Sequence, residues 1–173
     1  MFILNPTRIS IAPYNRQKAV SYAHKWALER NPKYYDFSKI GGDCTNFASQ
    51  VIYAGCGVMN YTPNTGWYYI NIKRRSPAWT DVDFLHRFLV NNRAKGPIAE
   101  EIDVKDIRPG DIVQLSFNKA NDFNHSPVVV KTGSTPDINN IEVAAHSIDR
   151  NHYPLANYDW AHIRFIHIKG AYH

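Results

Sequence analysis

The segment that sets the fold reads Gly41-Gly42-Asp43-Cys44-Thr45-Asn46-Phe47-Ala48-Ser49-Gln50. It joins a double glycine to a stretch of helical character, with Cys44 at the junction. The amides in the first turn of a helix have no acceptor within the helix, so this end carries partial positive charge, which stabilises a thiolate. The same amides can hydrogen-bond the oxyanion that forms when a carbonyl is attacked. Cys44 is therefore a candidate nucleophile for acyl chemistry, with a buried structural cysteine as the alternative.

The second cysteine illustrates that alternative. Cys56 lies in Ala54-Gly55-Cys56-Gly57, where no acidic, amide or hydroxyl side chain is its neighbour. The residues from Asp43 to Ala54 read as one helix that Gly55 ends, and such a helix would hold the two cysteines too far apart for a disulfide.

Length and composition indicate one globular domain over residues 1–173. Hydrophobic residues make up 44% of the chain and charged residues 20%. The apolar start, residues 1–4, is broken by Asn5-Pro6 and lacks the charged region and longer apolar core of a signal peptide. No apolar run approaches the roughly 18 residues that span a bilayer, so we expect no membrane insertion. The compartment stays open between the cytoplasm and the mature part of an exported protein.

The net charge of +5 and the pI of 9.2 raise the possibility of a nucleic-acid partner. The basic residues are scattered, however, and the one dense group is Lys73-Arg74-Arg75. A short basic cluster is usually a solvated face, so we expect no nucleic-acid binding. The aromatic cluster Trp67-Tyr68-Tyr69 could line a groove for an extended ligand, with Trp67 contacting substrate, or could pack in the core.

The hydrophobic period changes along the chain. Helical spacing starts after Pro13-Tyr14-Asn15 and stops at Asn31-Pro32, and the helix that begins at Asp43 is the second. Residues 57–79 read as a loop, and Thr80-Asp81-Val82-Asp83 resembles a capping box that starts a third helix ending near residues 91–92. Short β-branched runs follow at residues 112–117, 128–130, 141–145 and 163–168. Helices first and strands second predict an α+β fold with N-terminal helices packed on a C-terminal antiparallel sheet.

A thiolate nucleophile needs a base, and that base needs a third group to fix its tautomer. Among eight histidines, His125 lies in Asn124-His125-Ser126-Pro127, which leads directly into a valine strand, and His146 closes the next strand. Adjacent antiparallel strands would bring the two rings together. No His-Glu-x-x-His pattern or paired cysteine spacing occurs, which disfavours a zinc hydrolase, and we expect no metal and no cofactor.

Four motifs resemble the putative amidase domain family. They are Gly42-Asp43-Cys44-Thr45-Asn46-Phe47-Ala48-Ser49-Gln50, Pro109-Gly110-Asp111-Ile112-Val113-Gln114, His125-Ser126, and Ala145-His146-Ser147. The resemblance spans about residues 14–168. That family is similar to the CHAP and NlpC/P60 peptidases, which implies a papain-like fold and a cysteine amidase or peptidase that acts on a peptide or cell-wall amide.

The resemblance implies a role for each site residue. Cys44 would be the nucleophile, His125 the general base and acid, and His146 the residue that orients His125, with Asp149 and His152 as alternatives for that last role. Related enzymes hold a substrate amine with the residues that flank the cysteine, which here are Asp43 and Thr45. Acyl transfer would use the same residues as hydrolysis, and a binding module without turnover is a further alternative.

Overall fold

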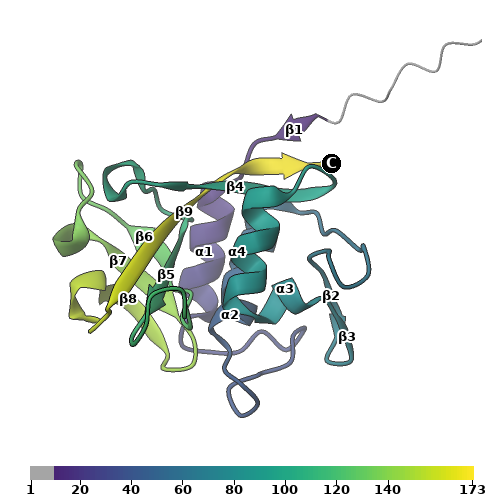
Figure 1. Ribbon diagram of the computed structural model, residues 1–173, viewed down its shortest axis with the longest axis horizontal. Helices are drawn as coiled ribbons and strands as arrows, with labels where there is room; N and C mark the ends of the chain where they lie inside the picture. The colour runs from purple at the N-terminus through teal and green to yellow at the C-terminus, as the bar shows by residue number, and fades with distance from the viewer. Residues whose placement is uncertain (1–9) are drawn as a thin grey trace, which may run out of the picture.

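The structure is a computed structural model that describes residues 10–173, so the apolar start at residues 1–4 lies outside the described part. Helices pack against a large antiparallel sheet, which confirms the predicted α+β class (Figure 1). The helices are α1 (Arg16–Trp26), α2 (Cys44–Cys56), α3 (Pro77–Thr80) and α4 (Val82–Asn91). The strands are β1 (Ile11–Ala12), β2 (Tyr69–Asn71), β3 (Arg74–Arg75), β4 (Gly96–Ile102), β5 (Ile112–Ser116), β6 (Val128–Lys131), β7 (Glu142–Ala145), β8 (Arg150–Pro154) and β9 (His162–Tyr172).

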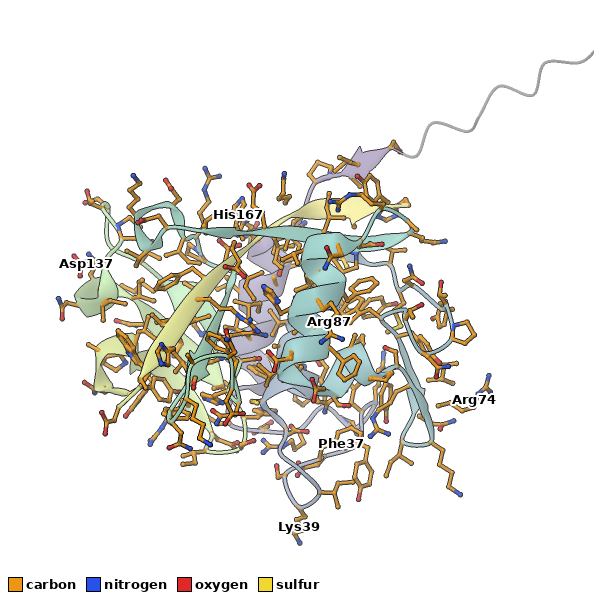
Figure 2. The ribbon with its side chains drawn as sticks, in the orientation of Figure 1. Phe37, Lys39, Arg74, Arg87, Asp137 and His167 are labelled. Carbon is orange, nitrogen blue, oxygen red and sulfur yellow. The ribbon has the colours of Figure 1, made fainter. Side chains whose placement is uncertain are left out.

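The main sheet has seven strands, in the order β1-β9-β5-β6-β7-β8, with β4 also paired to β9. Every pairing is antiparallel. Strands β2 and β3 form a separate hairpin, on which the exposed Arg74 projects away from the body of the protein (Figure 2). In the described part of the chain, no helix has both the length and the apolar character needed to cross a bilayer.

Both faces of the sheet are buried, because side chains alternate between the faces along each strand. Ile112, Val128 and Ala144 belong to the core between the sheet and the helices. Their neighbours Val113 and Val129 belong to a second core on the opposite face, which loops and 3-10 turns cover. The near-continuous apolar runs of the central strands follow from this double burial.

The boundaries of α2 differ from the prediction at its C-terminal end. Gly55 lies inside the helix, and Gly57 ends it with a φ of 69° and a backbone N–H that donates to Tyr53. A Cβ added at Gly55 would lie 2.1 Å from a ring carbon of Tyr14, so this glycine allows a close approach and does not stop the helix. The first helix also ends earlier than predicted, at Trp26.

Other differences concern short elements. The predicted loop at residues 57–79 contains β2, β3 and the start of α3. The N-cap of α4 is Asp81, whose side chain accepts from the Phe84 amide at 2.9 Å, and the predicted cap at Thr80 is one residue too early. Strands β4 and β8 were not predicted, because Gly96 and Pro97 read as turn residues and β8 is largely polar.

Candidate active site

Cys44 is the first residue of α2, as predicted. Gly41 and Gly42 have φ values of 103° and 102°, a conformation that glycine adopts at no steric cost. They turn the chain into the helix and bring Cys44 to a cavity of about 450 Å³. Cys44 is 8% exposed, while the other cysteine, Cys56, lies at the far end of α2, and both are free thiols.

The electrostatics of the thiol differ from the expectation for a helix N-terminus. Burial raises the pKa of Cys44 above its ordinary value. Hydrogen bonds to the side chain of Thr45 and to the backbone of Ser126 and Thr45 lower this pKa, and the carboxylate of Asp43 raises it. Removal from water is the largest of these effects, so the thiol keeps its proton at neutral pH.

His125 lines the same cavity as Cys44. Its backbone is fixed by the end of β5, where the Leu115 amide donates to the His125 carbonyl at 3.0 Å. Burial lowers the pKa of His125 to about 4, so its ring is neutral at neutral pH and can accept a proton. Its Nε2 lies 3.3 Å from the hydroxyl of Tyr158. Burial raises the pKa of Tyr158, so this hydroxyl keeps its hydrogen.

The cavity has an aromatic wall and few charges. Phe117, Tyr153 and Tyr158 supply rings, and the charged side chains that line it are Arg150 and Asp159. Sequence reasoning missed these residues, because they come from the loop after β5 and from the segment after β7, where no spacing pattern marks them. The cavity therefore presents both apolar and polar groups next to a thiol and a neutral imidazole.

His146 lies elsewhere than predicted. It follows β7, is 1% exposed, and stacks on the ring of Phe47 with centroids 4.1 Å apart. Its Nδ1 is 2.6 Å from Asp43 Oδ2, and its Nε2 is 2.7 Å from the carbonyl oxygen of Trp26. The prediction that His146 orients His125 is wrong, since other groups occupy both of its ring nitrogens.

The register of the sheet explains this error. Val128 of β6 pairs with Ala144 of β7. Continued by two residues, this antiparallel register sets Ser126, not His125, opposite His146. Because neighbouring residues along a strand point to opposite faces, His125 and His146 face different sides.

The two alternative orienting residues also have other partners. Asp149 receives two hydrogen bonds from Arg30, at 2.9 and 3.0 Å. His152 lies 2.7 Å from Glu142 and stacks on His24. Within residues 10–173, no three His, Cys, Asp or Glu side chains are grouped so that they could hold a metal ion.

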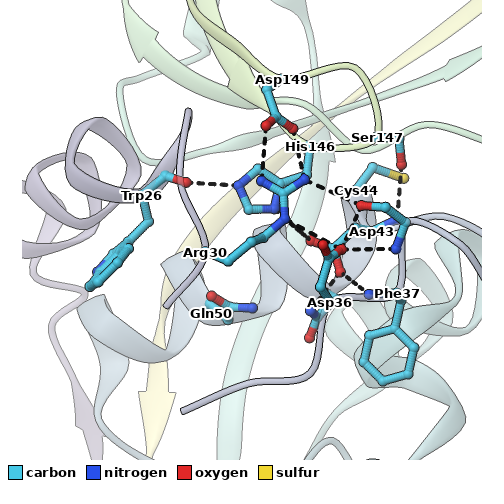
Figure 3. Close-up of polar contacts among 12 residues, drawn as sticks. Trp26, Arg30, Asp36, Phe37, Asp43, Cys44, Gln50, His146, Ser147 and Asp149 are labelled. Atoms are coloured by element: carbon cyan, nitrogen blue, oxygen red, sulfur yellow. Dashed lines mark hydrogen bonds and ion pairs between the residues drawn. The ribbon is translucent and has the colours of Figure 1, made fainter. Parts of the chain in front are cut away.

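The carboxylate of Asp43 is the centre of a buried network (Figure 3). Its Oδ1 accepts hydrogen bonds of 2.8 Å from the Phe37 backbone and from the Asn46 amide. Its Oδ2 contacts His146 and lies 3.6 Å from the Nε of Arg30. Asp43 has 0% exposure, so the prediction that it holds a substrate amine is wrong.

This network joins two walls of the cavity. The backbone amide of Asp43 donates to Ser147 Oγ at 2.8 Å, and Arg30 links Asp43 to Asp149 (Figure 3). Gly42 and Ser147 both line the cavity. The loop before α2 and the turn after β7 are therefore held together behind Cys44.

Two further residues predicted to contact substrate are buried. Thr45 is 1% exposed, with its Oγ1 3.8 Å from Cys44 Sγ and 3.4 Å from Ser126 Oγ. Trp67 is 0% exposed and donates its ring N–H to Ser49 Oγ at 3.0 Å. The prediction of a substrate contact is therefore wrong for both residues. Of the six predicted site residues, Cys44 and His125 line the cavity.

Comparison with known proteins gives a consistent assignment. An uncharacterized protein of Bacillus subtilis (strain 168), YhbB, is 34% identical over 130 residues, which make up 73% of this chain and 40% of that protein. The chain therefore corresponds to less than half the length of this relative. No solved structure matches the chain. Residues 13–168 match the family model described as "Putative amidase domain". Since this match covers most of the sequence, the chain belongs to the putative amidase domain family, whose name indicates the hydrolysis of amide bonds.

Proposed function

We propose that the protein is a cysteine amidase or peptidase that hydrolyses an amide bond through a thioester on Cys44. The observation that supports this proposal best is that Cys44 and His125 line one cavity while Tyr158 contacts one nitrogen of the His125 ring. A papain-like relationship to the CHAP and NlpC/P60 peptidases is part of the same proposal, and so is a peptide or cell-wall peptide as substrate.

The reaction starts from a neutral pair. The raised pKa of Cys44 and the lowered pKa of His125 leave a thiol and an unprotonated imidazole at neutral pH. As Cys44 Sγ attacks the substrate carbonyl, His125 accepts the thiol proton through Nδ1. The oxyanion accepts hydrogen bonds from the free backbone amides at the start of α2.

The intermediate then collapses. The C–N bond breaks, His125 returns the proton to the departing amine, and the acyl group stays on Cys44 as a thioester. A water molecule next gives a proton to His125 and attacks the thioester. The C–S bond breaks, the acid leaves, and His125 returns the proton to the Cys44 sulfur.

In this proposal, Tyr158 takes the orienting role that the family resemblance implied for His146. For Nδ1 to accept a proton, the hydrogen of the neutral ring must be on Nε2, which then donates to the Tyr158 oxygen at 3.3 Å. The Tyr158 oxygen can accept this hydrogen bond, so the contact is compatible with the reactive tautomer and restrains the ring. When the imidazolium forms, the same hydrogen bond becomes charge-assisted and therefore stronger.

A non-catalytic binding module has less support. That alternative relied on a groove at Trp67-Tyr68-Tyr69, and Trp67 is instead part of the core. The hydroxyl oxygen of Tyr69 also has a partner within the protein, since it accepts a hydrogen bond from the Tyr35 backbone amide at 2.9 Å.

The test compares the two cysteines. Purified protein is incubated with muropeptides and simple peptide amides, and released amines and acyl adducts are measured by mass spectrometry. Cys44→Ala should lower hydrolysis about a thousandfold or more, while Cys56→Ala, which removes a thiol that donates to Val58 at the far end of α2, should retain it. Equal losses in the two variants would contradict the proposal, and transfer of the acyl group to an added amine would identify a transferase.

A further inference from the structure

Arg150 stands out among the charged groups around the cavity. It is half-buried at the start of β8 and lines the cavity together with Cys44 and His125. In the described part of the chain no carboxylate lies within 4.0 Å of its guanidinium. Its guanidinium lies over the ring of Tyr153, 4.3 Å from the centroid.

The neighbouring Arg30 shows what a structural arginine looks like in the same region. It makes two hydrogen bonds to Asp149 and also lies within ion-pair distance of Asp36 and Asp43. Arg30 is thus surrounded by carboxylates of the protein, whereas Arg150 is not. A partly desolvated guanidinium without a protein carboxylate is suited to bind a carboxylate of a ligand, with two parallel N–H···O bonds.

A row of rings connects Arg150 with the proposed base. Arg150 lies over Tyr153, the rings of Tyr153 and Tyr158 are 5.0 Å apart, and those of Tyr158 and His125 are 5.4 Å apart. The positive charge of Arg150 acts on Tyr158 from this position. The stacking on Tyr153 also restricts the rotamers of Arg150, so less entropy is lost when it binds a ligand.

We propose that Arg150 binds a carboxylate of the substrate and makes the cavity selective for acidic acyl compounds, such as peptides with a free carboxylate near the scissile amide. This inference rests on the proposed cysteine chemistry. The other charged residue of the cavity, Asp159, is exposed and makes no ion pair within residues 10–173. Asp159 therefore does not neutralise Arg150, although its charge opposes the selectivity.

The test uses two small alkylating agents that differ in charge, iodoacetate and iodoacetamide. Their rates of reaction with Cys44 are measured by mass spectrometry at about pH 8, near the ordinary pKa of a thiol, and the ratio is normalised to the same ratio in urea-unfolded protein. A positive group in a cleft raises the local concentration of an anion about tenfold or more at low salt. We expect the normalised ratio to favour iodoacetate by about that factor and to fall with added salt.

Three variants complete the experiment. Arg150→Gln should abolish the preference for iodoacetate, and Asp159→Asn should retain or increase it. Arg108→Gln removes the same charge from an exposed position outside the cavity and should leave the ratio unchanged. An unchanged ratio in Arg150→Gln, or equal losses in Arg150→Gln and Arg108→Gln, would overturn the inference.

The outcome also separates this inference from the proposed function. If Cys44 reacts with neither reagent while Cys56 becomes modified, the cysteine mechanism itself fails. If Cys44 reacts with both reagents at the ratio of the unfolded protein, the cysteine mechanism stands and only the selectivity for carboxylates is overturned.

Discussion

Replacing His146 by alanine tests whether this residue is structural or catalytic. The substitution removes the contact to Asp43 at 2.6 Å, the hydrogen bond to the Trp26 carbonyl at 2.7 Å and the stacking on Phe47. Because Asp43 is fully buried, its carboxylate would lose a partner that water cannot easily replace. Removing one partner of a buried charged group costs up to about 3–5 kcal/mol. We expect the lower part of this range, since Phe37 and other donors still contact Asp43.

This decrease in the free energy of unfolding is large, because a typical domain is stabilised by only about 5–15 kcal/mol. Urea unfolding followed by circular dichroism measures it as a decrease in the midpoint. The matched control is His152→Ala, because His152 also contacts a carboxylate, but its side chain is 55% exposed. An exposed pair contributes about 0–1 kcal/mol, so this variant should unfold close to the wild type.

Two results would refute this reasoning. One is a midpoint for His146→Ala equal to that of His152→Ala. The other is unchanged stability with a large loss of turnover, which would return His146 to the catalytic role that the sequence suggested. If the alanine variant does not fold, His146→Gln is measured in its place, because glutamine retains an N–H donor. Its urea midpoint should lie below that of the wild type.

The sequence predicts the fold class because the spacing of apolar residues records which faces are buried. The predicted alternation of side chains along β7 is also correct, since Ala144 and His146 both face the helices. The partner of His146 could not be predicted, because it depends on the register between β6 and β7 and on the turn at Gly41-Gly42 that delivers Asp43. Register and positive φ are set by tertiary packing, which a single sequence does not show.

The same distinction holds for the site. Cys44 could be identified because its surroundings are local, a glycine turn followed by a helix. Arg150 reaches the cavity from β8, and Tyr158 reaches it from the irregular segment after β8. Neither periodicity nor a motif marks these two residues in the sequence. Burial raises the Cys44 pKa in spite of the helix terminus, so the position of a cysteine in the sequence did not predict its protonation state.

Two further predictions concern the proposed base. Tyr158→Phe removes the hydroxyl that contacts His125 Nε2 at 3.3 Å. We expect kcat to fall about tenfold, the lower limit for a hydrogen bond to a charged group, while KM and the urea midpoint stay nearly unchanged. A proportional loss of stability would instead indicate that Tyr158 has a packing role. The second prediction follows from the neutral resting pair, because the pKa of Cys44 is raised and that of His125 is lowered to about 4. Alkylation of Cys44 by iodoacetamide should therefore be slow at about pH 6 and increase only as the pH passes the ordinary thiol pKa of about 8.5. Amide hydrolysis should behave differently, since His125 is unprotonated above pH 4 and takes the thiol proton during attack. Its rate should stay level through neutral pH and fall as the pH decreases toward about 4, where His125 becomes protonated and can no longer accept a proton. Rapid alkylation at about pH 6 that is lost in His125→Gln would show that a thiolate–imidazolium pair already exists at rest, and it would contradict the general-base mechanism.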